Sequence, residues 1–240
     1  MKRVKIAHFP GIALTIGLIS LLAYLLGWSS LLAVRTISIS GTSESALIQG
    51  SIDAGTPRIT IGEPLARVDV QSLRRRILLN QWITSAAIGR SWLHGTLTVA
   101  VHERTPVASY QTPDGTTHYF DAAGLDFLSP LTYPALPNIS LANSGTRAKE
   151  EVAKLITTLD EKSPDLLIHA RAFTLTTAGN GNTNLGMKIE LSPTRTITIR
   201  WGDSIDIPLK IAIYQKLLAL KENEKARVFD LSDPLSPITK

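Results

Sequence analysis

The chain has 240 residues, of which 44% are hydrophobic and 19% are charged, so it can form a packed core and is not a disordered chain. The formal net charge is +5, but Lys2, Arg3 and Lys5 lie in the first five positions and the remainder is close to balanced. Because a nucleic-acid protein needs a basic face along a groove-reading element, we exclude nucleic acid as a partner. The absence of cysteine excludes disulfides, thiolate metal sites and a cysteine nucleophile.

A long stretch without charge lies near the N-terminus. No charged residue occurs between His8 and Arg35, and this stretch exceeds the roughly 20 apolar residues that cross a bilayer core. We predict a cytoplasmic tail over residues 1–9 and a transmembrane helix over residues 10–32. The basic residues before the helix place the N-terminus in the cytoplasm and the bulk of the chain outside the cell membrane, by the positive-inside rule.

A cleaved signal peptide is the alternative interpretation of this stretch. Its apolar core would be about 7–15 residues long and would end at a small-x-small cleavage site. Gly27-Trp28-Ser29 is a poor match to such a site, and the apolar run continues past it to Val34. The sequence therefore favours a retained, single-pass membrane anchor.

Residues 33–103 are predicted to form a small α+β domain with the order β-α-α-β-β. Asp69 is a good N-cap, and apolar residues recur at helical spacing after it. Leu97, Val99 and Val101 alternate with other residues, which indicates a strand with one buried face. The predicted elements are a strand at 34–39, helices at 43–54 and 69–77, and strands at 82–90 and 97–103.

Residues 104–240 are predicted to form a second, mainly antiparallel β-domain with two covering helices. The run Thr112-Pro113-Asp114-Gly115 is a turn sequence, because proline presets φ and glycine accepts positive φ, and it predicts a hairpin. Sequential strands with two amphipathic helices indicate an antiparallel sheet covered on one face. The predicted helices are 146–162 and 208–221, and the predicted strands are 170–176, 185–191, 196–201 and 228–231.

No pattern in the sequence indicates catalysis, a cofactor or a metal. The five histidines form no zinc-binding pair, and neither a nucleophile elbow nor a glycine-rich phosphate loop is present. We interpret Glu103-Arg104 as an ion-pair or hydrogen-bonding group at the domain junction, and Asp121 and Asp126 as turn residues. We expect a protein that is not an enzyme and takes no cofactor, metal or small-molecule substrate.

Several short motifs, in this order and spacing, resemble the FtsQ/DivIB family of bacterial cell-division proteins. The POTRA domain of that family is similar to VRTISISG, GEPLARVD, WITSAAIGRSW and TLTVAVHERTPVASY of this chain. Residues 120–127 and 130–137 resemble the start of the family's β-domain. Leu93 stands where the family usually has proline, and His94-Gly95 adds a residue, which predicts a bulged or longer hairpin loop.

The resemblance implies a non-enzymatic division scaffold in the cytoplasmic membrane, enriched at the septum. It would bind FtsB- and FtsL-like partners and help control septal peptidoglycan synthesis. The family binds its FtsB-type partner along an edge strand near the C-terminus, which corresponds here to residues 228–231 and those just after. The implied partner-contact residues are Phe229, Asp230, Leu231, Ser232, Asp233, Leu235 and Ile238.

Two features keep alternatives open. Pro234 and Pro237 lack a backbone donor, so strand pairing through them must be broken or confined to alternate positions. Residues 228–231 could also be an interior strand, in which case mutation there would unfold the domain. A membrane-anchored extracytoplasmic enzyme would need a convergent catalytic set. A POTRA-type translocation or assembly factor would need several repeats or many transmembrane strands, for which the chain after Arg104 is too short.

Overall fold

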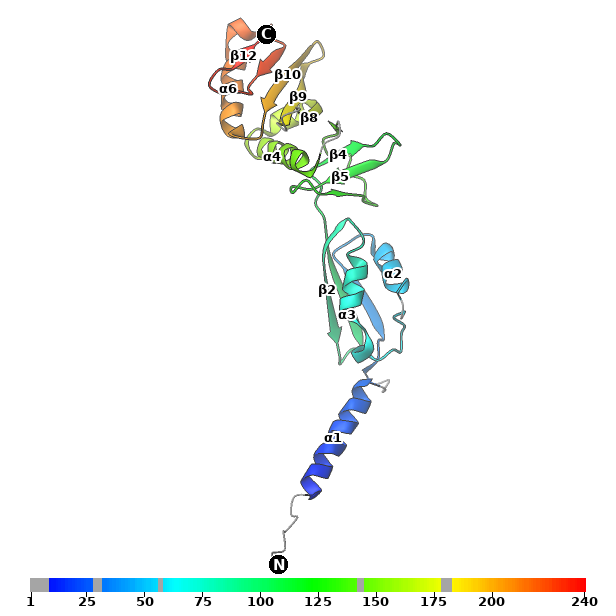
Figure 1. Ribbon diagram of the computed structural model, residues 1–240. Coiled ribbons are helices and arrows are strands. Elements are labelled where there is room, and N and C mark those ends of the chain that lie inside the picture. The colour runs from blue at the N-terminus through cyan, green and yellow to red at the C-terminus, as the bar shows by residue number, and fades with distance from the viewer. Residues whose placement is uncertain (1–8, 28–31, 56–57, 142–144, 178–182) are drawn as a thin grey trace, which may run out of the picture. The chain divides into compact units, whose positions relative to one another are not determined.

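The computed structural model describes residues 9–27, 32–55, 58–141, 145–177 and 183–240 (Figure 1). Contacts between residues divide the chain into two compact units, Met1–Glu103 and Arg104–Lys240. Each unit is described by itself below.

The N-terminal helix α1 spans Phe9–Gly27, so it begins one residue before the predicted helix 10–32. Residues 28–31, and residues 1–8 of the predicted tail with their basic side chains, lie outside the described part of the chain. Of the helices that the structure describes, none combines the length and the apolar character needed to cross a membrane. The large apolar side chains described on α1 are exposed, namely Leu14, Ile16, Leu18, Ile19, Leu21, Leu22 and Tyr24.

The rest of the first unit has the predicted order β-α-α-β-β, with the 3₁₀ helix η2 before the second of these helices. In chain order its elements are β1 (Thr36–Ser40), α2 (Ser45–Asp53), η2 (Leu65–Arg67), α3 (Val70–Ile77), β2 (Ile83–Ser91) and β3 (Thr96–Glu103). The strand order is β1-β3-β2, with β1 parallel and β2 antiparallel to the central β3. The predicted α+β architecture of this unit is confirmed.

Local sequence explains both the start of α3 and the hairpin of the first unit. Asp69 caps α3 as predicted, because its Oδ1 accepts hydrogen bonds from the N–H groups of Gln71 and Ser72, both at 3.0 Å. The hairpin between β2 and β3 closes at the pair Ser91 and Thr96, so residues 92–95 form its turn. The turn therefore contains the Leu93 and His94-Gly95 positions that predicted a bulged or longer loop, and its length relative to the family stays a prediction.

The second unit is built on a six-stranded sheet and a separate three-stranded sheet. The small sheet contains β4 (Ala108–Gln111), β5 (Thr117–Phe120) and β6 (Asp126–Phe127), in that order. The large sheet has the order β12-β11-β10-β9-β8-β7. Its strands are β7 (Ile139–Leu141), β8 (Ala170–Thr177), β9 (Thr183–Ser192), β10 (Arg195–Gly202), β11 (Val228–Asp230) and β12 (Ile238–Thr239).

The large sheet is antiparallel across β8, β9 and β10 and again between β11 and β12. The pairs β7–β8 and β10–β11 are parallel, so the predicted mainly antiparallel domain contains two parallel pairs. The helices of this unit are α4 (Thr146–Lys162), α5 (Pro164–Ile168), α6 (Ile207–Ala219) and the 3₁₀ helix η3 (Lys221–Asn223). The predicted bounds of α4 are confirmed at both ends.

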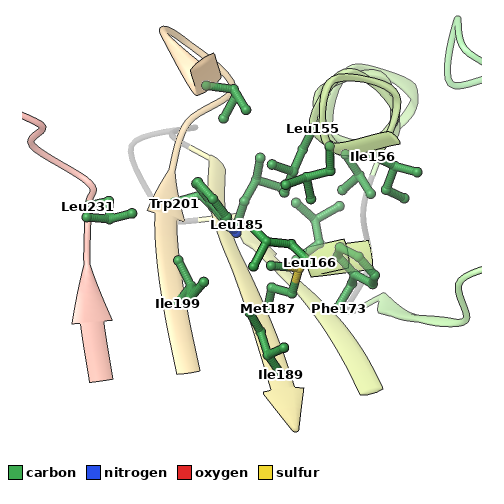
Figure 2. Close-up of a cluster of buried hydrophobic side chains, with 14 of the residues drawn as sticks. Leu155, Ile156, Leu166, Phe173, Leu185, Met187, Ile189, Ile199, Trp201 and Leu231 are labelled. Atoms are coloured by element: carbon green, nitrogen blue, oxygen red, sulfur yellow. The ribbon is translucent and has the colours of Figure 1, made fainter. Parts of the chain in front are cut away.

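One face of the large sheet and the apolar stripes of the helices form a single core. Figure 2 shows Leu155 and Ile156 of α4 over side chains of the sheet, among them Leu185 and Met187, and all four belong to one buried cluster. Trp201 is fully buried in the same cluster. On the three central strands the buried residues alternate with polar ones, so the opposite face of the sheet is polar.

A buried lysine fixes the start of α6 to the end of β10. Lys210 is 1% exposed, and its Nζ donates to Trp201 O at 2.7 Å, Asp203 O at 3.1 Å and Asp203 Oδ1 at 2.8 Å. All three ammonium donors are therefore satisfied, which makes burial of this charge tolerable. Partial burial acts to raise the pKa of Asp203, but the hydrogen bond from Lys210 and that from Ile205 N outweigh it and lower the pKa.

Candidate partner-binding edge

The predicted edge strand, β11, lies between β10 and β12 in the sheet, so neither of its edges is free. β11 pairs with β10 on one side, with Phe229 opposite Ile199, and with β12 on the other, with Asp230 opposite Ile238. The prediction that residues 228–231 form the free edge is therefore wrong, and the edge belongs to β12 (Ile238–Thr239).

The physical reason is the turn that separates the two strands. Pro234 and Pro237 do interrupt strand pairing, but the interruption reverses the chain and brings it back antiparallel. Asp233 makes that turn, because its Oδ1 accepts from Leu235 N at 2.9 Å and its O accepts from Ser236 N at 3.2 Å. The prolines therefore mark a turn before an additional strand.

Two of the predicted contact residues belong to the core. Phe229 and Leu231 are fully buried, and the Phe229 ring packs edge-to-face against the ring of Tyr214 with centroids 5.3 Å apart. Neither side chain reaches the surface, so these two residues could meet a partner only through their backbone, and the prediction that a partner engages them stays a prediction. For Phe229 and Leu231 the interior-strand alternative holds.

The remaining predicted residues lie on the surface beside the new edge. Leu235 is 89% exposed and Ile238 is also exposed, although both are large and apolar. Ser232 and Asp233 are exposed in the turn. These residues place two unburied apolar side chains next to an edge strand.

Asp230 points to the polar side of the sheet and is held there. Its Oδ1 accepts from Ser232 N at 3.1 Å, and its Oδ2 lies 3.5 Å from Nη1 of Arg200 on β10. Partial burial acts to raise the pKa of Asp230, but the hydrogen bonds from Ser232 and Arg200 outweigh it and lower the pKa. This carboxylate therefore holds the residues that follow β11 in place, and its hydrogen bonds leave it less available to contact a partner.

The polar face beside this edge is hollowed. A shallow depression of about 380 Å³ is lined by residues of four strands and of the segment after β11, including Thr174, Gly186, Thr198, Arg200, Asp230 and Ser232. At Gly186 an added Cβ would lie 2.5 Å from Thr174 Oγ1, so glycine keeps the floor of the depression open.

The backbone of β12 leaves one residue free to pair outward. Val228 N donates to Lys240 O at 2.9 Å, and Lys240 N donates to Val228 O at 3.0 Å. Because hydrogen-bonded and non-hydrogen-bonded pairs alternate in an antiparallel ladder, the N–H and C=O of Thr239 point away from β11. Pro237, two residues earlier, can offer a carbonyl but no N–H.

Two residues that sequence reasoning missed hold β12 in place. Thr239 Oγ1 donates to Asn223 Oδ1 at 3.0 Å, and Asn223 Nδ2 donates to Leu217 O of α6 at 2.9 Å. Asn223 is buried at the end of η3. A strand of two residues leaves no periodicity in the sequence, so nothing there could have indicated this lock.

The junction residues Arg104 and Asp121 have structural roles, as interpreted. Arg104 forms an ion pair with Asp121 and lies 5.6 Å from the ring centroid of Phe127. Asp121 Oδ1 also accepts from the N–H of Ala123 and of Leu125, as expected for a turn aspartate. The ion-pair interpretation is confirmed for Arg104 and the turn interpretation for Asp121, whereas Glu103 Oε1 is buried without a hydrogen-bond partner in the described part of the chain.

Asp126 instead pairs with Lys149, a buried residue of α4 that the sequence did not single out. The Lys149 ammonium group also donates to Tyr110 Oη at 3.3 Å and lies 4.8 Å from the centroid of that ring. This cluster ties the small sheet to α4. It accounts for the position of Asp126 without any catalytic role.

Comparison with known proteins places this architecture in a family. Residues 32–104 match the family described as "POTRA domain, FtsQ-type". The chain is 29% identical over 235 residues to a protein of Mycobacteroides abscessus named "Cell division protein FtsQ", covering 95% of this chain and 69% of that protein. The chain belongs to the FtsQ/DivIB family.

Two further relatives carry the same name. The Streptomyces bingchenggensis protein is 29% identical over 227 residues, which cover 89% of this chain and 78% of the relative. The Mycobacterium leprae protein is 27% identical over 213 residues, covering 87% of this chain. The aligned region spans only 56% of the Mycobacterium leprae protein, a little over half of that relative's length.

Proposed function

We propose that this protein is a non-enzymatic scaffold of the cell-division complex, which binds FtsB- and FtsL-like membrane partners at the septum and helps control septal peptidoglycan synthesis. The names of the relatives support the cell-division role. The observation that carries the binding role is the edge strand β12, in which Ile238 is exposed, with Leu235 exposed in the turn before it. Edge strands bind partners by strand addition and need no catalytic residue.

The proposal assigns a role to each part of the chain. Residues 33–103 would be the POTRA domain and residues 104–240 the partner-binding β-domain, in keeping with the two compact units and the match over 32–104. Residues 1–9 would form a cytoplasmic tail. This division places the partner edge in the second unit.

Residues 10–32 would anchor the chain as a single-pass segment of the cytoplasmic membrane. The support is the absence of charge between His8 and Arg35 and the exposure of large apolar side chains all round α1. A helix that is apolar on every side needs apolar surroundings, whereas a surface helix has one polar face. Lys2, Arg3 and Lys5 would then keep the N-terminus in the cytoplasm.

The partner would add a strand outside β12. Its backbone would pair with the outward N–H and C=O of Thr239, and its apolar side chains would contact Ile238 and Leu235. Pairing can extend only a short way, because Pro237 supplies no donor. Side-chain contacts would therefore carry a large share of the affinity.

The test is a titration of the full-length chain, reconstituted in lipid nanodiscs, with the extracytoplasmic part of the FtsB-like protein. We expect Leu235→Glu combined with Ile238→Glu to weaken binding about tenfold, or roughly 1.4 kcal/mol, with unchanged thermal unfolding. Ile168→Glu is the matched control, because Ile168 is 69% exposed on α5, away from this edge. Wild-type affinity of the folded double variant would rule out β12 as the binding edge.

A further inference from the structure

Two turns of the first unit meet the entering chain at the start of β1. Arg35 N donates to Gly95 O at 2.7 Å, which places the β2–β3 turn beside the start of β1. Val34 N donates to Glu63 O at 2.8 Å, and Gly62 N donates to Val34 O at 2.8 Å. We call this surface the entry end; it comprises residues 33–35, 60–64 and 92–95.

The entry end exposes large apolar side chains at the tips of two turns. Leu93 is 88% exposed and Ile61 is 75% exposed, and Trp92 beside Leu93 is also exposed. None of the three belongs to the buried core of the unit. Large apolar side chains that stay exposed to water at a turn do not stabilise the fold. Their grouping at one end therefore indicates a surface that contacts an apolar phase.

Basic side chains also occur at the entry end and next to it. Arg35 is exposed, whereas the guanidinium of Arg90 lies 5.9 Å from the ring centroid of Trp92 and donates from Nη2 to Val68 O at 2.6 Å. Arg67 follows in η2, and Glu63 is the acidic residue within the entry end. Tryptophan and aliphatic side chains beside arginine are the composition that binds the interface of an anionic membrane.

The length of chain before the entry end keeps it near any membrane anchor. Ala33, which bridges to Pro64, follows the last residue of α1, Gly27, by six positions. A segment of that length spans at most about 20 Å. If α1 lies in the bilayer, the entry end stays within that distance of the point where the chain leaves it.

The geometry points to the entry end as a lipid-docking surface: Leu93, Trp92 and Ile61 enter the interfacial layer of an anionic bilayer, and Arg35 faces its phosphates, while Arg90 holds Trp92 in place from within the unit. This inference rests on the proposed anchoring, and it gives the first unit a second attachment to the membrane. The dock would restrict the tilt of the unit and so favour one orientation of the chain at the surface.

The absence of native cysteine makes a direct test possible. The full chain is reconstituted in nanodiscs of phosphatidylglycerol and phosphatidylcholine in equal parts, with a fluorescent label at Leu93→Cys and spin-labelled lipid as quencher. Leu79→Cys is the matched control, because Leu79 is 79% exposed and lies just before β2, whereas Leu93 lies just after it. The nine residues of β2 separate the two labels by about 30 Å.

We expect lipid to quench the label at Leu93 several-fold more strongly than the label at Leu79, and the difference to shrink in discs of phosphatidylcholine alone. Equal quenching at the two positions would overturn the docking inference. Equal quenching of Leu93 in both lipid compositions would overturn the role of Arg35 in binding anionic lipid.

A third label, at Leu18→Cys in α1, separates the two hypotheses. Quenching at Leu18 without quenching at Leu93 supports membrane anchoring by α1 and contradicts lipid docking at the entry end. Quenching at neither position contradicts the anchoring as well as the dock. Quenching at Leu93 alone supports the dock and contradicts the anchor.

Discussion

At the residue scale, Lys210 shows how a charge in the core can hold one element to another. Its ammonium group is surrounded by two backbone carbonyls and the carboxylate of Asp203. We expect Lys210→Met to lower the free energy of unfolding by about 2 kcal/mol, because it leaves the buried carbonyl of Trp201 without a donor. Urea unfolding monitored by circular dichroism measures the loss.

Lys216→Met is the matched control on the same helix, because Lys216 is exposed. Its effect should stay within about 0.5 kcal/mol. Equal losses in the two variants would mean that the lysine charge acts through the net charge of α6, and that the contacts to Trp201 and Asp203 contribute little.

Tyr214 presents the opposite case, a buried polar atom that the described residues do not satisfy. Its hydroxyl has no hydrogen-bond partner in the described part of the chain, and burial raises its pKa to about 12. We expect Tyr214→Phe to leave the free energy of unfolding unchanged or to raise it by up to about 1 kcal/mol, because the edge-to-face contact with Phe229 remains. A loss beyond 1 kcal/mol would show that the hydroxyl has a partner in solution.

At the scale of elements, β12 is held by the side-chain hydrogen bond from Thr239 to Asn223 as well as by its backbone pairing with β11. Thr239→Val keeps the shape of the side chain but removes the donor to Asn223 Oδ1. We expect this to cost about 1 kcal/mol locally and to speed hydrogen exchange at the amide of Val228 about fivefold, because that amide bonds to Lys240 O.

Thr239→Ser retains the hydroxyl and is the control for this experiment. It should preserve protection of the Val228 amide. Protection that falls equally in both variants would assign the stability of β12 to packing of the threonine methyl group, with no role for the hydrogen bond to Asn223.

At the scale of the whole molecule, the first unit has its own core, separate from the buried cluster of the second. Gly95 in the β2–β3 turn has φ +66°, and an added Cβ would lie 2.7 Å from Ala33 O. Gly95→Ala should therefore lower the melting temperature of the first unit while affinity for the partner proposed at β12 stays unchanged, because that edge belongs to the other unit.

Gly62→Ala provides the comparison within the same unit. Gly62 has φ +97° but no atom within 4 Å of an added Cβ, so the substitution adds backbone strain without a clash. Calorimetry should show a smaller shift for Gly62→Ala than for Gly95→Ala. Loss of partner binding in Gly95→Ala would show that the two units do not act independently.

The amino-acid sequence by itself determined the elements with strong local signals. The apolar stripe of Thr146–Lys162 predicted α4 with both ends correct, Asp69 predicted the start of α3, and alternation in 97–103 predicted β3. These signals succeed because periodicity and capping act within a few residues of each other. They also sufficed for the resemblance to the FtsQ/DivIB family.

Only the tertiary structure decided which strand is the edge. Val228–Asp230 is equally strand-like at an edge or inside a sheet, and the answer depends on Ile238–Thr239, which is too short to show a period. The burial of Lys149 and Lys210, and the placement at one end of the two turns that carry Ile61 and Leu93, likewise come from residues distant in sequence. Pairing between distant segments follows from how the whole chain packs, because no local preference specifies which neighbour a strand will have.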